Sequence, residues 1–314
     1  MDVAVQLGLL VGGLALALVA SDVAVAYARS VAAALGAPAF VVGVVLVGVG
    51  TDLPEIANSI AAHVQGQGDV NVGDSVGSAL TQDTLVLGIA PFIAGTLLIV
   101  RRQVGLVTGL TVAGLSLAAW AVSDGYLSRL DGALLVLAWV VFTVIVVRVL
   151  GGTHVADVPP AVRVHSMPGR AAVLLVALLL VGAGATAAVH ALVDLAETLG
   201  VPEFALAFFG ASIGTSAPEI VVVLTALARG APAIALGDAL GSSLADASLS
   251  IGSGPLVAPG EVTARLGVIG SLYTLAGIAL VGLLLVVRRR HDRRSGVALL
   301  GIYLLAYAVL IAAD

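Results

Sequence analysis

Two motifs, each present twice, carry the residues of this chain that could do chemistry. Gly50–Glu55 reads Gly-Thr-Asp-Leu-Pro-Glu and Gly214–Glu219 reads Gly-Thr-Ser-Ala-Pro-Glu. A Gly-Asp-x-x-Gly-Ser motif follows each of them, at Gly73–Ser78 and at Gly237–Ser242. Carboxylates, hydroxyls and main-chain carbonyls are hard oxygen ligands of the kind that binds Ca²⁺. The motifs therefore predict a cation site.

The two copies are related by a constant offset of 164 residues. No insertion is needed to align Gly50–Pro91 with Gly214–Pro255, and 15 of these 42 positions are identical. An internal repeat of this length predicts two related halves, each of which supplies one set of ligands.

The composition is that of a membrane protein. Hydrophobic residues make up 60% of the 314 residues and charged residues only 11%, whereas soluble domains are about a quarter charged. Several apolar runs reach the roughly 20 residues that cross a bilayer. The first run, after Asp2, lacks a cationic start and is interpreted as a helix and not a cleaved signal. No cysteine is present, which excludes disulfides, thiol nucleophiles and thiolate metal sites.

We expect an all-α polytopic membrane protein with ten transmembrane helices. Residues 1–150 would form a first five-helix repeat with its motif region at 43–91. Residues 151–170 would form a cytoplasmic linker, and 171–314 a second five-helix repeat with its motif region at 207–255. The spans are expected at approximately 4–28, 38–64, 72–99, 103–123, 130–150, 171–192, 202–228, 236–257, 266–287 and 296–313.

Because five is odd, the second repeat must enter the bilayer from the opposite side, which makes the halves an inverted repeat of the kind found in secondary transporters. The basic residues, all arginine, agree with this topology. With both termini outside the cytoplasm, only Arg129 and Arg265 fall outside, and cytoplasmic loops are expected to be rich in Lys and Arg. The arginines expected inside are Arg29, Arg101, Arg102, Arg148, Arg163, Arg170, Arg229, Arg288, Arg289, Arg290, Arg293 and Arg294.

Pro54 and Pro218 should break the second and seventh spans, because proline lacks an N–H and clashes with the carbonyl four residues earlier. Unpaired backbone within a bilayer is tolerated only where it is buried in protein or lines a wet cavity. The symmetry of an inverted repeat would bring Glu55 and Glu219 together at mid-membrane, where two carboxylates need a cation or a proton between them. The alternative interpretation is a pair of structural prolines beside protonated, hydrogen-bonded glutamates.

The third and eighth spans add a second polar group. Ser78 and Ser242 are followed four residues later, on the same helix face, by Gln82 and Asp246. Each serine could bond back to its own helix, but the duplication with a polar partner favours a role in ion binding.

With these residues in view, the sequence resembles the calcium/cation antiporter superfamily, in particular its prokaryotic sodium/calcium exchanger-like branch. The resemblance covers nearly the whole chain and rests on the long, paired motifs. It implies that Glu55 and Glu219 are the main Ca²⁺ ligands, with Thr51 and Thr215 assisting them. It also implies exchange of cytoplasmic Ca²⁺ for external Na⁺ or H⁺ by alternating access, with the first and sixth helices sliding against the rest.

The resemblance implies further ligands beyond these four residues. Flanking sodium sites would use hydroxyls and main-chain carbonyls, and a central polar pair would lie between them. These residues are Ser78 and Ser242, the carbonyls near Gly48 and Ser212, and the pair Gln82 and Asp246.

Several positions depart from the pattern of the superfamily. Asp52 stands where serine is usual, while its repeat mate Ser216 keeps it, and we count both among the candidate ligands. Asp74 and Asp238 replace asparagines, either as helix N-caps, the interpretation we prefer, or as an ion vestibule. Asp83 takes a position that is ordinarily apolar. Additional carboxylates favour a divalent ion or could carry protons, so the counter-ion stays open.

These features predict a secondary-active antiporter that exports Ca²⁺ in exchange for Na⁺ from a multi-pass position in the cell membrane. A Ca²⁺/H⁺ antiporter is the alternative, and a passive cation channel a remote one. We expect no enzyme, because no His-Glu-x-x-His occurs, neither Gly-Asp pair has the Gly-x-Gly-Asp form, and Ser253 has no obvious histidine partner. We expect no cofactor, no nucleic acid and no obligate protein partner, only the bilayer and the transported ions.

Overall fold

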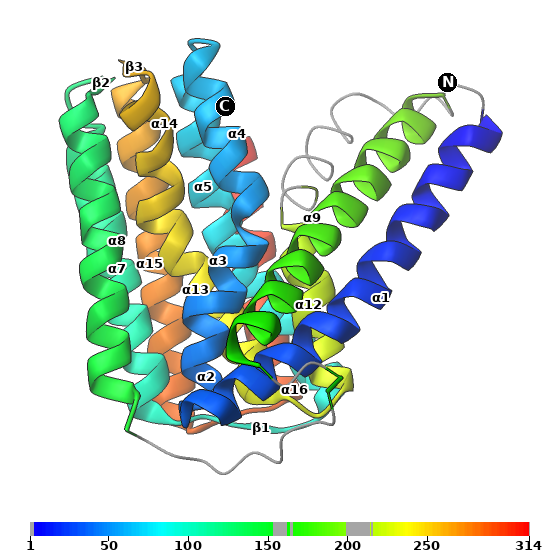
Figure 1. Cartoon of the computed structure of the whole chain (residues 1–314). Helices are drawn as coiled ribbons and strands as arrows, with labels where there is room; N and C mark the ends of the chain where they lie inside the picture. Colours follow the sequence, from blue (N-terminus) through cyan, green and yellow to red (C-terminus); the bar gives the residue numbers. More distant parts are fainter. Residues whose placement is uncertain (1–2, 153–161, 164–165, 199–213, 215, 314) are drawn as a thin grey trace. The chain divides into compact units, whose positions relative to one another are not determined.

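The computed structural model divides into two compact units of helices (Figure 1). Unit 1 comprises Met1–Pro54 and Thr153–Asp238, and unit 2 comprises Glu55–Gly152 and Ala239–Asp314. Each unit therefore takes residues from both predicted halves of the chain. The residues described are 3–152, 162–163, 166–198, 214 and 216–313.

Unit 1 is built around two long helices, α1 (Val3–Leu35) and α9 (Met167–Thr198), which pack along each other (Figure 1). Glycines let their backbones touch: a Cβ on Gly13 would come within 2.6 Å of the Gly184 carbonyl oxygen. Small residues allow such close approach in membrane helices. The other elements of unit 1 within its described residues are α2 (Ala39–Val42), η1 (Gly43–Val47), α3 (Gly48–Thr51), α12 (Ala217–Ala228) and the first seven residues of α13 (Pro232–Ala245).

Unit 2 contains the remaining helices and four short strands. The strands pair antiparallel in twos, Leu97 with His291 and Tyr126 with Glu261, and tie together loops at the helix ends. The elements are α4 (Leu53–Val64, from Glu55), α5 (Gly68–Thr81), η2 (Gln82–Val86), α6 (Leu87–Ala94), β1 (Leu97–Leu98), α7 (Arg101–Ala121), β2 (Tyr126–Leu127), α8 (Arg129–Leu150), η4 (Asp246–Ser250), α14 (Ile251–Val257), β3 (Gly260–Glu261), α15 (Ala264–Arg288), β4 (Arg290–His291) and α16 (Arg293–Ala313).

The core of unit 2 lies where α7 packs on α15 and α8 packs on α14. Leu115, Leu135, Ile251 and Ile278 are fully buried there. Burial of such side chains contributes about 1.5–3 kcal/mol each relative to exposure in water, although in a membrane shape and packing matter more than transfer from water.

Large apolar side chains are also exposed along whole helix faces. Leu137, Val141 and Val144 are exposed on α8, and Leu175 and Leu179 on α9. Apolar faces of this extent on helices long enough to span are lipid-facing surfaces. The expectation of an all-helical, polytopic membrane protein is therefore confirmed.

Six of the described helices are long and apolar enough to cross a membrane, or seven if the pair interrupted at Asp52 is one span. The third predicted span, 72–99, begins earlier and ends earlier, because the helical run is Gly68–Ala94 and Leu97–Leu98 form a strand. The part of the seventh predicted span before Gly214 lies outside the described residues, as does most of the predicted linker.

Among the described residues, three five-residue π-helical turns interrupt the helices, and the sequence did not predict them. η2 begins at Gln82 and η4 begins at Asp246, which are repeat mates at the 164-residue offset. η1 precedes α3 in the second predicted span. Such turns occur frequently at functional sites, and η2 and η4 begin at polar residues that are predicted to bind ions.

Candidate cation site

The second predicted span is interrupted at the expected place. α3 ends at Thr51, Asp52 forms a bend, and α4 restarts at Leu53, one residue before Pro54. A helix can accept proline in its first turn, where the N–H has no partner within the helix. The proline therefore marks the start of a new helix at this position.

The second copy restarts its helix in the same way. α12 begins at Ala217 with Pro218 second and Glu219 third, just as α4 begins with Leu53, Pro54 and Glu55. Each glutamate thus lies in the first turn of a helix, where the macrodipole stabilises a negative charge. The Pro-Glu pair of each motif therefore places a carboxylate at the N-terminus of a helix.

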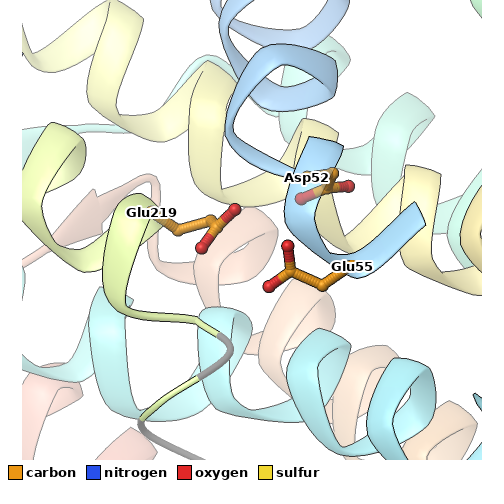
Figure 2. A group of neighbouring side chains, drawn as sticks. All are labelled: Asp52, Glu55 and Glu219. Carbon is orange, nitrogen blue, oxygen red and sulfur yellow. The ribbon is translucent and has the colours of Figure 1, made fainter. Parts of the chain in front are cut away.

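Asp52 and Glu219 bring two carboxylates together within unit 1 (Figure 2). Each offers an oxygen that lies within 4.8 Å of the other's, and both side chains are 0% exposed. Glu55, also drawn in Figure 2, is the first residue of unit 2 and is likewise buried. Two ionised carboxylates at this separation in a low dielectric repel each other strongly unless a cation or a proton lies between them.

Thr51 lies beside this pair and is surrounded by oxygen atoms. Its hydroxyl is 2.9 Å from the Gly48 carbonyl oxygen, 3.2 Å from that of Val47 and 3.2 Å from Asp238 Oδ1. The Gly48 carbonyl also accepts the Asp52 N–H. This end of unit 1 therefore offers a hydroxyl, carbonyls and carboxylates, which is the ligand chemistry of a hard cation.

The second polar group lies in unit 2. Gln82 Nε2 donates to Asp246 Oδ2 at 3.3 Å and lies 3.5 Å from Ser78 Oγ. These three side chains and that of Ser242 are all buried. Gln82 and Asp246, which the resemblance pairs at the polar centre, thus lie within hydrogen-bond distance of each other.

One polar contact of unit 2 was missed in the sequence. Ser243 Oγ lies 2.8 Å from Asp83 Oδ1, 3.1 Å from Gln82 Oε1 and 3.2 Å from the Ala79 carbonyl oxygen. The repeat offset could have indicated it, because Ser243 is the mate of Ala79, which lies one turn before Asp83 on the same helix face. The buried Asp83 is thereby linked to the Gln82–Asp246 group.

The candidate ligands are thus divided between the units. Unit 1 holds Gly48, Thr51, Asp52, Glu219 and Ser216, which is the buried residue preceding α12. Unit 2 holds Glu55, Ser78, Gln82, Ser242 and Asp246. Thr215 and Ser212 lie outside the described residues.

The interpretation of Asp74 and Asp238 as helix N-caps is wrong. Each is the seventh residue of its helix, because α5 begins at Gly68 and α13 at Pro232. Asp74 is half-buried and accepts from Asn58 Nδ2 at 2.6 Å, whereas Asp238 is fully buried beside Thr51.

A cavity of about 550 Å³ in unit 1 lies against the helix break. Gly50 and Pro54 line it from the break, and Gly182, Thr186 and His190 line it from α9. The helix break therefore faces open space along α9.

Comparison with known proteins gives consistent matches. The family described as sodium/calcium exchanger protein matches residues 5–148 and 170–312. The chain is 30% identical over 307 residues to the putative antiporter CaxA of Alkalimonas amylolytica, covering 92% of this chain and 93% of that one. It is 28% identical over 268 residues to the inner membrane protein YrbG of Escherichia coli (strain K12), covering 81% and 80% of the two chains.

The fold is also similar to that of a solved structure, the sodium-calcium exchanger NCX_Mj. The TM-score is 0.79 at 25% sequence identity, and the match covers 98% of both chains. The arrangement of helices is thus shared over the whole length.

Proposed function

Because the chain belongs to the sodium/calcium exchanger protein family and is a cation antiporter of that family, we propose that it exports Ca²⁺ in exchange for Na⁺ by alternating access. The observation that carries this proposal is the pair of buried carboxylates, Asp52 and Glu219, at two helix N-termini or breaks. A divalent cation between them would neutralise both charges and supply the interaction that they need in a low dielectric.

The remaining ligands follow from the repeat. Glu55 is the mate of Glu219, is buried, and occupies the same position in the first turn of its helix, so it would complete the Ca²⁺ site. The buried serines and the Gln82–Asp246 pair would form flanking sodium sites and the polar centre between them. The proposed ligands are Glu55, Glu219, Thr51, Thr215, Asp52, Ser216, Ser78, Ser242, Gln82, Asp246 and the carbonyls near Gly48 and Ser212.

Ten transmembrane helices in two inverted five-helix repeats would frame this site, with the second and seventh spans, and the third and eighth, interrupted. The matched π-turns η2 and η4 support the symmetry of the third and eighth spans. The arginine distribution supports termini outside the cytoplasm. Similarity to an inner membrane protein supports a multi-pass position in the cell membrane.

Coupling follows from the charge of the site. An empty site with several ionised carboxylates is costly to carry through a low-dielectric barrier, whereas the same site filled with Ca²⁺ or with Na⁺ ions is nearly neutral. Only the filled forms would interconvert between inward-facing and outward-facing states. Exchange is then obligatory and uncoupled leakage is suppressed.

A Ca²⁺/H⁺ antiporter of the same fold is the second candidate, and one observation favours it. Asp83 is 1% exposed and is connected through Ser243 to the Gln82–Asp246 group. A carboxylate at this place could carry a proton as counter-ion.

Uptake of radioactive Ca²⁺ into proteoliposomes tests the proposal. Vesicles loaded with Na⁺ and diluted into Na⁺-free medium should accumulate Ca²⁺, whereas protein-free vesicles and vesicles with equal Na⁺ on both sides should not. Uptake driven only by an imposed pH gradient would support the proton-coupled alternative. Uptake that needs no counter-ion gradient at all would indicate a channel and contradict antiport.

A further inference from the structure

Asp238 is a buried carboxylate of which only one oxygen has a hydrogen-bond partner among the described residues. It is the seventh residue of α13 and its side chain is 0% exposed. Oδ1 lies 3.2 Å from Thr51 Oγ1, and Oδ2 has no hydrogen-bond partner among the described residues. No arginine or histidine of the described chain forms an ion pair with it. A buried carboxylate in this condition is unfavourable unless a cation or a proton joins it.

Oxygen acceptors outnumber protons around the Thr51 hydroxyl that contacts Asp238. The single hydroxyl proton of Thr51 faces the carbonyl oxygens of Val47 and Gly48 as well as Asp238 Oδ1, all at 2.9–3.2 Å. A hydroxyl can donate to only one of them well. A carbonyl oxygen that accepts a backbone N–H, as the Gly48 carbonyl does from Asp52, keeps a second lone pair with which it could coordinate a positive ion.

Two glycines place Asp238 in this position. A Cβ on Gly43 would lie 2.7 Å from the Ile234 carbonyl oxygen and 2.9 Å from Gly237 Cα, and a Cβ on Gly237 would lie 2.3 Å from the Phe40 carbonyl oxygen. The start of α13 therefore packs backbone to backbone against α2 and η1, closer than any larger residue allows. This contact holds the Asp238 carboxylate beside the last turn before the helix break.

Its repeat mate has no such surroundings. Asp74 is half-buried and accepts a hydrogen bond of 2.6 Å from Asn58 Nδ2. The same motif thus produces a half-buried aspartate that accepts a hydrogen bond from an amide in one copy, and a fully buried aspartate beside a hydroxyl in the other.

We propose that Asp238 is a cation ligand: with Thr51 and the carbonyls of Val47 and Gly48 it forms a Na⁺ position next to the Asp52–Glu219 carboxylates. This inference rests on the proposed function and adds a ligand to that site. The charge balance selects the ion, because one carboxylate among neutral oxygens suits a monovalent cation, whereas two or more carboxylates suit Ca²⁺. Asp238 would therefore set the affinity for Na⁺ and leave Ca²⁺ affinity largely to the glutamates.

Competition between Na⁺ and radioactive Ca²⁺ on the purified full chain tests this. In Asp238→Asn, the Na⁺ concentration that displaces half of the bound Ca²⁺ should rise at least about tenfold, while Ca²⁺ binding without Na⁺ is retained. Asp74→Asn is the matched control and should stay within about twofold of the wild type. Thr51→Val, which removes the hydroxyl at nearly constant volume, should shift Na⁺ competition in the same direction and covers the case in which Asp238→Asn does not fold.

Several results would overturn the inference. The first is an unchanged Na⁺ competition in folded Asp238→Asn. If Asp238→Asn does not fold, an unchanged Na⁺ competition in Thr51→Val has the same meaning. The second is a loss of Ca²⁺ binding by folded Asp238→Asn at zero Na⁺, which would assign Asp238 to the Ca²⁺ position instead. If the wild type binds no Ca²⁺, the proposed function fails, and the inference is then decided separately by thermal stability. Because an ion that binds only the folded state raises the melting temperature, Na⁺ should stabilise the wild type and Asp74→Asn but not Asp238→Asn. Equal stabilisation of all three, or none in the wild type, would contradict the Na⁺ position.

Discussion

Asp74 and Asp238 occupy the same place in two copies of one motif, yet their surroundings are opposite. Asp74 lies half-buried against the amide of Asn58. Asp238 is fully buried beside Thr51, held there by the contact between Gly43 and Gly237. What differs is the neighbouring segment: α4 presents an amide to the first aspartate, and the end of α3 presents the Thr51 hydroxyl to the second. The sequence repeat thus gives the two aspartates the same place in their helices but different chemical surroundings.

The two copies can be compared by substitution at three pairs of repeat mates and at Asn58, the hydrogen-bond partner of Asp74, and each substitution measures how far the copies are equivalent. The largest effect is expected where the copies agree, at Glu55 and Glu219. Either residue changed to glutamine removes one charge from the proposed Ca²⁺ site with little change in shape. Ca²⁺ exchange in proteoliposomes should fall by at least about 100-fold, comparable to the loss of one member of a buried charge pair. Normal Ca²⁺ uptake by either folded variant would contradict the assignment of that glutamate as a Ca²⁺ ligand. Unequal losses would show that the two glutamates contribute unequally to Ca²⁺ binding.

The next effect is expected at Asp52 and Ser216, where the copies differ in charge. Asp52→Ser makes the copies alike and removes a carboxylate that lies within 4.8 Å of Glu219. The ratio of Ca²⁺ to Na⁺ affinity should fall by about tenfold, or about 1.4 kcal/mol. Ion competition on the purified protein measures this ratio. If neither this affinity ratio nor the pH profile of exchange changed, Asp52 would have no role in ion selectivity or proton transfer.

A smaller effect is expected at Ser243 and Ala79, which are also repeat mates. Ser243→Ala removes the hydroxyl that Asp83 contacts at 2.8 Å and should cost about 1–3 kcal/mol of stability, because a buried carboxylate loses its donor. The melting temperature in detergent measures the loss. Ala79→Ser is the control in the other copy and should change stability by less than about 1 kcal/mol, since a helical serine can bond to its own preceding turn. Equal changes in both variants would mean that Asp83 gains nothing from Ser243.

The smallest effect is expected at Asn58, the partner of Asp74. Asn58→Ala breaks a partly exposed hydrogen bond and should cost about 0.5–1.5 kcal/mol in melting experiments without altering the rate of Ca²⁺ exchange. If Asn58→Ala instead slowed Ca²⁺ exchange as much as Glu55→Gln does, Asp74 would belong to the ion pathway, and the contrast with Asp238 would disappear.

Much of the fold could be predicted from composition and proline chemistry. Long apolar runs predict the spans, and a proline in such a run is favoured in the first turn of a new helix, as found at Pro54 and Pro218. The contact between Gln82 and Asp246 was predictable from the repeat offset, since mates in a symmetric pair of helices tend to meet.

The error at Asp238 has a physical cause. Hydrophobicity marks the part of a helix that lies in the bilayer, whereas the helix itself begins earlier, at Pro232, a residue favoured at a first helical position. A span begun at 236 places Asp238 in the first turn, where a cap is reasonable. The π-turns could not be predicted either, because nothing in the local residue types of Gln82–Val86 or Asp246–Ser250 distinguishes five residues in a π-turn from the same residues in an α-helix.

Each π-turn accommodates one residue more than an α-helical turn. Since an α-helix advances about 100° per residue, the segment after η2 or η4 is rotated by about that angle relative to an uninterrupted helix. A chain with one residue fewer in Gln82–Val86 would therefore form a regular helix of nearly the same length, but its two ends would present different faces to their neighbours. Single-residue insertions and deletions at these two points are thus a means by which relatives could reorient the polar half of a span while leaving its other half in place.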